Sequence, residues 1–94
     1  MTVVAVQRYE GDVAEHLRRY RVANSLLTHR GPAEGVLSHL CYATPDALVI
    51  VNVWVDEGAA RAAGRREDFR SALARAGMTY VEPEFFPVVQ HTVH

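Results

Sequence analysis

This 94-residue sequence has one cysteine and almost no net charge. These two features argue against a disulfide-stabilised protein and against a protein that binds nucleic acid or anionic membranes. Cys41 is the single cysteine, so an intramolecular disulfide cannot form, which fits a reducing compartment such as the cytosol. The 10 basic and 11 acidic residues give a formal net charge of −1 at pH 7. A chain so nearly neutral indicates neither a nucleic-acid partner nor an anionic membrane surface.

Targeting and membrane-spanning segments are also missing from the sequence. No apolar run approaches the roughly 18 residues that a membrane helix needs. The first residues, MTVVAVQRYEG, lack the basic start and the long apolar core of a signal peptide. We therefore expect a single domain over residues 1–94, soluble and cytoplasmic, with no membrane partner.

The spacing of histidines and glycines excludes several common sites. His91 and His94 lie three apart in a segment expected to be extended, so they point to opposite faces and cannot hold one metal ion. The sequence has neither a glycine-rich phosphate loop nor a Gly-x-Ser-x-Gly elbow, and Cys41 has no activating neighbour. We therefore assign no metal.

The segment Ala47–Ala60, ALVIVNVWVDEGAA, predicts a strand that leads directly into a helix. Its side chains alternate between an all-valine row and a mixed row that contains an amide and an indole. The valine row is Val49, Val51, Val53 and Val55, and the mixed row is Leu48, Ile50, Asn52 and Trp54. A strand that is apolar on both faces belongs in the middle of a sheet and is covered on both sides. We expect the mixed row to form the wall of a cavity.

Turn and capping signals predict six elements in the order β-α-β-β-α-β. They are a strand over Thr2–Tyr9, a helix from Asp12 to the sequence HRGP, a strand over Gly35–Ala43, the strand from Ala47, a helix from Asp56 to Gly77 that is weakened at Gly64, and an edge strand within Tyr80–Val93. This order is typical of an α+β, ferredoxin-like fold with an antiparallel sheet. Right-handed crossovers place both helices on one face, so the other face exposes an apolar patch. We therefore predict a homodimer that packs sheet to sheet.

Two short motifs resemble the antibiotic biosynthesis monooxygenase-like domains of the dimeric α/β-barrel superfamily. They are VIVNVWVDEGA at 49–59 and VAVQRY at 4–9. The resemblance implies that two subunits pair into a dimeric α/β barrel, with a cavity between the sheet and the helices of each. It also implies that Trp54 lines this cavity and that Gln7 takes the place of a first-strand Asn. The family's Asn four residues before the Trp is Ile50 here, whereas Asn52 lies two residues before Trp54 and faces the same side.

The same resemblance implies an enzyme that needs no metal, flavin or haem. In the cofactor-independent members, the deprotonated substrate itself gives an electron to dioxygen. The expected function is oxidation of a phenolic or polycyclic aromatic metabolite, of anthrone or quinol type, with O2 in secondary metabolism. Trp54, Asn52 and Gln7 would hold the ionised oxygen by hydrogen bonds. The haem-degrading branch needs an axial His on the second helix, and no His occurs between Cys41 and Gln90.

Three further side chains complete the predicted site. His39 is the best candidate acid or base if it faces the cavity, and it is structural if it faces the dimer side or an edge. Tyr20 and Asn24 lie on the inward stripe of the first helix and would orient the substrate rings. Structural alternatives remain, because Asn24 can bond the sheet or face water and Trp54 can be plain core. His16, His29 and Arg30 are expected to be solvated.

Two other functions are compatible with the sequence. One is a cyclase, isomerase or lyase of a small aromatic metabolite with His39 as the acid or base, which would not depend on dioxygen. The other is a non-catalytic dimer domain that binds a small ligand or a partner protein. In that domain Gln7, Asn24 and Asn52 would bond to one another or to the backbone and leave no open cavity.

Overall fold

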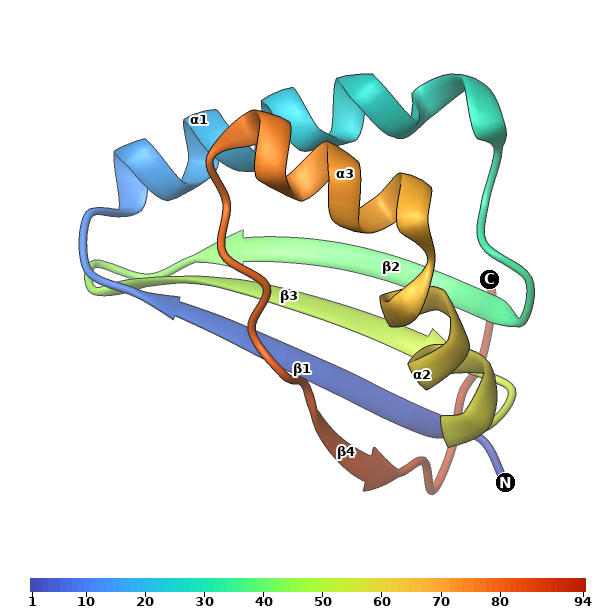
Figure 1. The fold of residues 1–94 in the computed structure, drawn as a ribbon. Coiled ribbons are helices and arrows are strands. Elements are labelled where there is room, and N and C mark those ends of the chain that lie inside the picture. The colour runs from blue at the N-terminus through green and yellow to red at the C-terminus, as the bar shows by residue number, and fades with distance from the viewer.

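The computed structural model describes residues 1–94 apart from the side chain of His29, so the prediction that His29 is solvated lies outside the described residues. Over the described chain there are four strands, three α-helices and one 3-10 turn (Figure 1). The strands are β1 (Val3–Glu10), β2 (Val36–Ala43), β3 (Ala47–Trp54) and β4 (Glu84–Pro87). The helical elements are α1 (Val13–Leu27), the 3-10 turn η1 (Thr28–Arg30), α2 (Glu57–Arg65) and α3 (Glu67–Ala76).

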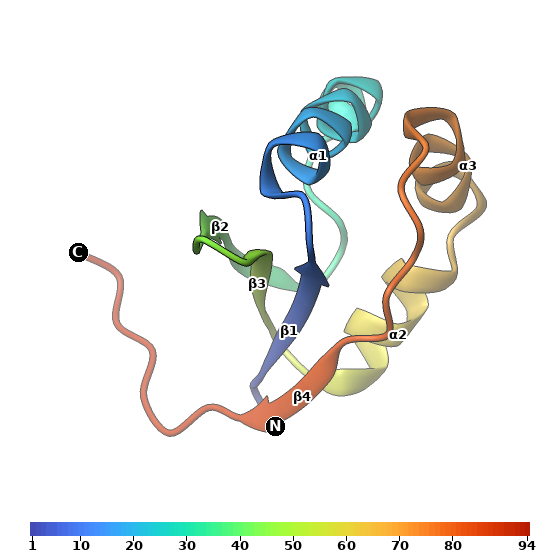
Figure 2. The same ribbon diagram turned by 90° about the vertical axis from the view of Figure 1, so that its left-hand side faces the viewer.

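All four strands join one antiparallel sheet in the order β2-β3-β1-β4. The valine-rich strands β1 and β3 take the central places, as predicted. Helices α1 and α3 cover the same face of the sheet (Figure 2), which right-handed β-α-β crossovers require. The predicted α+β, ferredoxin-like fold is thereby confirmed.

Helix ends lie at the capping residues that the sequence indicated. Asp12 accepts a hydrogen bond from the Glu15 N–H at 3.2 Å, and Asp56 accepts one from the Ala59 N–H at 2.7 Å. Gly77 ends α3 with φ +73° and ψ +23°, a left-handed conformation that glycine adopts without a Cβ clash. These caps determine where α1 begins and where the chain passes from β3 into α2.

The helix expected from Asp56 to Gly77 is divided in two. The break falls at Arg66, whose φ of −62° and ψ of 137° are extended, rather than at the weak Gly64. Helix α2 therefore ends one residue after Gly64, and α3 starts in a new direction (Figure 1). No described helix is long and apolar enough to cross a membrane.

The last strand is shorter than the extended segment Tyr80–Val93 that was expected. Only Glu84–Pro87 pairs with β1, at the edge of the sheet. The strand is bounded by Pro83 and Pro87, which have no N–H to give to a ladder. The prolines therefore limit β4 to an edge position, as predicted.

Buried side chains form two clusters on the helix-covered face of the sheet. The first cluster joins β1 and β3 to α1 and α3, and its members are Tyr9, Ala23, Leu48, Ile50, Leu73, Ala76 and Met78. The second joins the other end of the central strands to α2, and its members are Val3, Ala5, Trp54 and Ala60. Residues of both clusters line one cavity, so the core is hollow where the two clusters face each other.

The opposite face of the sheet is not covered by any described helix (Figure 2). On this face Leu40 of β2 and Phe86 of β4 are 54% and 47% exposed, whereas Val49 of the predicted valine row is only 2% exposed. The C-terminal segment runs on this side, where Ser38 Oγ and His91 Nε2 lie 3.3 Å apart. The face therefore carries exposed apolar side chains beside the charged Arg8 and Glu84, and it is open over much of its area.

Candidate functional site

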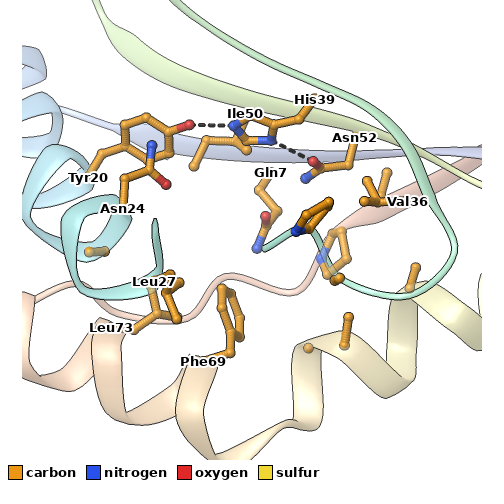
Figure 3. Close-up of a pocket in the computed structure, with 18 of the residues that line it drawn as sticks. Gln7, Tyr20, Asn24, Leu27, Val36, His39, Ile50, Asn52, Phe69 and Leu73 are labelled. Atoms are coloured by element: carbon orange, nitrogen blue, oxygen red, sulfur yellow. Dashed lines mark hydrogen bonds between the residues drawn. The ribbon is translucent and has the colours of Figure 1, made fainter. Parts of the chain in front are cut away.

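A cavity of about 490 Å³ lies between the sheet and the helices (Figure 3). All six residues that the sequence predicted for the site line this cavity, and they are Gln7, Tyr20, Asn24, His39, Asn52 and Trp54. They come from β1, α1, β2 and β3, so no single element forms the site. Strand pairing explains part of the convergence, because Asn52 is opposite Ala5 on one side and His39 on the other.

His39 is the centre of a hydrogen-bonded chain at the cavity. Its Nδ1 lies 2.5 Å from Asn52 Oδ1, and its Nε2 lies 2.5 Å from the Tyr20 hydroxyl oxygen (Figure 3). An amide oxygen can only accept a hydrogen bond, so Nδ1 carries the proton and donates it to Asn52. In the neutral imidazole, Nε2 keeps its lone pair and accepts from the Tyr20 hydroxyl. The chain Tyr20–His39–Asn52 therefore brings the second ring nitrogen of His39 to a phenol.

Tyr20 reaches this chain from α1, above the sheet. Burial raises the pKa of its phenol above the usual value, and the neighbouring Asn24 amide opposes that rise. A raised phenol pKa keeps the Tyr20 hydroxyl protonated near neutral pH, so it remains a donor to His39. Asn24 and His39 are themselves exposed, which places the opening of the cavity between α1 and the edge strand β2.

Gln7 is held by a hydrogen bond to the backbone of a distant segment. Its Nε2 donates to the carbonyl of Val81 at 2.7 Å, which ties β1 to the segment that follows α3. The side-chain oxygen and the second N–H of Gln7 remain for a ligand. Gln7 therefore combines a structural bond with a place on the cavity wall.

Trp54 is both a core residue and a wall of the cavity. It is 8% exposed and belongs to the same buried cluster as Val3, Ala5 and Ala60. It also lines the cavity on the face that carries Asn52. The sequence left open whether Trp54 is a cavity residue or a core residue, and its position fits both descriptions.

Arg30 is a cavity residue that the sequence analysis did not include. It was expected to be solvated, but its side chain is only 20% exposed and lines the cavity. The 3-10 turn η1 extends α1 and brings Arg30 to α3, where Nη1 donates to Asp68 Oδ2 at 3.1 Å. No periodic pattern or motif marks this turn, so the sequence offered no signal for it.

His16 and Cys41 do not line the cavity. His16 was expected to be solvated, but it is partly buried and its Nε2 lies 2.7 Å from the Glu10 carbonyl oxygen. Burial raises the pKa of the Cys41 thiol, which disfavours a reactive thiolate. Among the side chains that the structure describes, no group of three or more His, Cys, Asp or Glu could hold a metal ion.

Several solved structures are similar to this chain over almost its whole length. SnoaB from Streptomyces nogalater, described as a cofactor-independent oxygenase, is 24% identical with a TM-score of 0.67 over 96% of this chain and 95% of that one. A proposed antibiotic biosynthesis monooxygenase from Caulobacter crescentus is 16% identical, with a TM-score of 0.71 over 95% and 91%. Rv0793 from Mycobacterium tuberculosis is 12% identical, with a TM-score of 0.70 over 99% and 100%.

No protein-family model and no curated protein sequence matches the chain. The likeness is therefore one of structure at low sequence identity, and what it establishes is the fold. The chain has the ferredoxin-like fold of structures described as antibiotic biosynthesis monooxygenases, which is the resemblance that its motifs predicted.

Proposed function

We propose that this protein is a cofactor-independent monooxygenase that oxidises a phenolic or polycyclic aromatic metabolite, of anthrone or quinol type, with O2. The observation that carries the proposal is the Tyr20–His39–Asn52 chain at the opening of a largely apolar cavity. Support comes from the shared fold with SnoaB, which is described as a cofactor-independent oxygenase. A role in secondary metabolism is part of this proposal.

The cavity suits a flat aromatic ligand. Its volume of about 490 Å³ is within the range of about 300–1,000 Å³ that is common for small-molecule sites. Apolar and aromatic side chains form most of its wall, among them Ile50, Trp54, Phe69, Leu73 and Met78. Such walls exclude water and strengthen hydrogen bonds made to an anion inside.

The first step in this proposal is removal of a proton from the substrate. The substrate hydroxyl displaces the Tyr20 hydroxyl from His39 Nε2 and gives its proton to that nitrogen. The imidazolium that forms keeps Nδ1–H on Asn52 Oδ1, which holds the ring in place. Tyr20 then donates to the new oxyanion, and Trp54 offers its indole N–H to the same anion.

The second step uses the electrons of the substrate anion. One electron passes to O2, and the resulting substrate radical and superoxide combine at carbon. The O–O bond of the peroxide then breaks, which yields a carbonyl and a water molecule. For an anthrone, one CH2 group and O2 are converted to one C=O group and water, so the reaction balances without an added reductant.

A homodimer through the open face of the sheet is the second part of the proposal. Exposed apolar side chains on that face, Leu40, Tyr42 and Phe86, are each more than 40% exposed. A second copy of the chain offers the same apolar surface in a self-complementary arrangement. The resemblance to the dimeric α/β-barrel superfamily supports this pairing.

The same residues support a second candidate function that does not use dioxygen. A His–Tyr pair at a cavity can move a proton between two positions of one substrate, as a cyclase, isomerase or lyase of a small aromatic metabolite requires. His39 would again be the base, and Tyr20 would be the acid that returns the proton. Dependence on O2 separates the two candidates.

The test is incubation with anthrone and with a naphthohydroquinone, with and without air and without added cofactor. We expect quinone formation coupled to O2 uptake in wild type, and a large loss of both in His39→Gln, Asn52→Ala and Trp54→Phe. Turnover that is unaffected by removal of O2 would support the second candidate. Tight ligand binding without any turnover would indicate the non-catalytic binding domain.

A further inference from the structure

We propose that Tyr80 is a positioning residue for the cavity, which packs against Gly64 and thereby holds the amide of Gln7 in one orientation toward the ligand. The proposal deepens the function given above and rests on it for the role of Gln7. Tyr80 belongs to residues 79–83, the segment between α3 and β4, which we call the strap (Figure 2). Tyr80, Gly64 and Gln7 all line the same cavity.

The strap is held by side chains rather than by a backbone ladder. It follows Met78, whose N–H donates to the Leu73 carbonyl at 2.9 Å, and it ends where β4 begins. Among the contacts that the structure describes, residues 79–83 make no backbone-to-backbone hydrogen bond. The position of such a segment depends on the few side chains that contact it.

Val81 is the point at which the strap meets β1. Its carbonyl accepts from Gln7 Nε2 at 2.7 Å. The Val81 backbone also hydrogen-bonds Tyr9, and this bond opposes the rise that burial causes in the pKa of the Tyr9 phenol. Because one N–H of Gln7 is bonded to Val81, the place of that carbonyl determines where the second N–H and the oxygen of the amide point.

Tyr80, the preceding residue, fixes the other side of the strap to the helices. Its ring lies edge-on to Phe69, with centroids 6.1 Å apart and planes at 88°. The Cζ atom of Arg70 lies 3.8 Å from the Tyr80 ring centroid, and Arg70 Nε donates to the Gly64 carbonyl at 2.5 Å. Two residues of α3 therefore limit the rotation of the Tyr80 ring.

Gly64 allows Tyr80 to approach α2 this closely. A Cβ at this position would lie 2.7 Å from the Tyr80 hydroxyl oxygen and 3.4 Å from the ring carbon Cζ. The first distance is too short for a non-bonded contact, whereas the second is ordinary. Because the ring is rigid and its rotation is limited, a methyl group at Gly64 must displace Tyr80 together with the strap. The glycine that weakens α2 thus gives the strap its place.

The experiment observes the Gln7 side-chain amide by NMR, in the protein without ligand. Gln90 is exposed and serves as the reference amide in the same spectrum. In wild type, we expect the slower Gln7 amide proton to exchange with water about two- to tenfold more slowly than those of Gln90, the range of one neutral hydrogen bond. Gly64→Ala should abolish this difference.

Addition of Tyr80→Phe to Gly64→Ala should restore the slow exchange, because phenylalanine lacks the oxygen that meets the new methyl group. Gly58→Ala is the matched control in the same helix and should behave as wild type. A Cβ at Gly58 would lie 3.4 Å from Asp56 Oδ1, which is an ordinary contact. A role of Tyr80 in stability alone would leave the Gln7 amide unchanged.

The proposal is overturned by equal exchange of Gln7 and Gln90 in wild type, by slow exchange that survives in Gly64→Ala, or by a double variant that is not restored. If Gly64→Ala does not fold, Tyr80→Ala should release the Gln7 amide and Tyr80→Phe should retain it; the same exchange in both would refute the role of Tyr80. No substrate or O2 is used. A protein that shows these amide signals but oxidises nothing would refute the proposed monooxygenase and leave the role of Tyr80 standing.

Discussion

His39 Nδ1 and Asn52 Oδ1 lie 2.5 Å apart across the paired strands β2 and β3. This contact determines which nitrogen of the imidazole carries a proton, and it directs the basic nitrogen to Tyr20. Because the two residues are directly opposite in the register, the contact is set by the sheet rather than by a loop. Asn52 is therefore a positioning residue for the proposed base.

Asn52→Leu should lower kcat by about tenfold or more, because it removes the acceptor that fixes the tautomer of His39. Asn52→Asp should restore much of the activity, since a carboxylate also accepts from Nδ1. It should also move the acidic limb of the pH–rate profile to higher pH, because its negative charge favours the imidazolium. The measurement is kcat against pH for both variants. Ser25→Ala, on α1 but outside the cavity, is the control, and an identical profile in all three variants would contradict the positioning role.

His39→Gln should lower the rate of quinone formation by about 100-fold to 10,000-fold, the usual contribution of a general base. Tyr20→Phe should have a smaller effect, because it removes a donor to the anion but leaves Nε2 in place. His16→Gln is the matched control, since His16 contacts the Glu10 carbonyl outside the cavity. The measurement is the initial rate of quinone formation under air for each variant. A fully active His39→Gln would show that His39 is not the base.

Trp54→Phe should separate the two roles of the indole. The free energy of unfolding should fall by less than about 1.5 kcal/mol, because an aromatic ring is kept in the core. The oxidation rate should fall more clearly, because the N–H that meets the anion is lost.

Leu48→Ala is the contrasting variant. Leu48 is 1% exposed, so truncation should cost about 2–5 kcal/mol of stability. Urea unfolding and initial rates measure both effects; a Trp54→Phe protein with full activity would make Trp54 a core residue alone.

Stability should depend on pH through Glu15 on α1. Hydrogen bonding to Arg18, with the charges of Arg18 and Arg19, lowers the pKa of this carboxylate from 4.5 to about 2. A carboxylate with a lowered folded-state pKa stabilises the fold above its unfolded pKa, and this stabilisation is lost as pH falls from 4.5 to about 2. Because the group is exposed, the effect should be small.

The measurement is the urea midpoint of wild type and Glu15→Gln across that acidic range. Wild type should lose its advantage over Glu15→Gln as the pH falls. Glu34→Gln, in the exposed loop before β2, serves as the control and should follow wild type. A constant difference between wild type and Glu15→Gln at every pH would show that the ion pairs do not contribute.

Leu40→Glu should convert the proposed homodimer to a monomer without loss of the fold. Leu40 is 54% exposed on the open sheet face, so a charge there is tolerated in one subunit but not between two apolar faces. Val22→Glu is the control, because Val22 is 36% exposed on α1, away from that face. Sedimentation velocity distinguishes the states; a wild type that is monomeric at micromolar concentration would refute the dimer.

Local patterns, together with the family resemblance, were sufficient for the fold and for the choice of cavity residues. Alternation along β1 and β3 placed Gln7, Asn52 and Trp54 on one face, and helical spacing placed Tyr20 and Asn24 opposite them. The caps at Asp12 and Asp56 are equally local, since each accepts from an N–H three residues ahead. These features follow from side-chain periods of two and 3.6 residues, which depend only on neighbours along the chain.

Long-range contacts decided the rest. The sequence left His39 between the cavity and an edge, and only the pairing of β2 with β3 brings it to Asn52. Arg30 is expected to be solvated from its place after a helix, yet its ion pair with Asp68 spans 38 residues and fixes it in the cavity. The helix break at Arg66 and the short β4 also differ from the local patterns. The sequence alone thus determined which residues share one face of a strand or helix, because periodicity is a local property. The tertiary structure determined which of them touch, because contact depends on how distant elements pack.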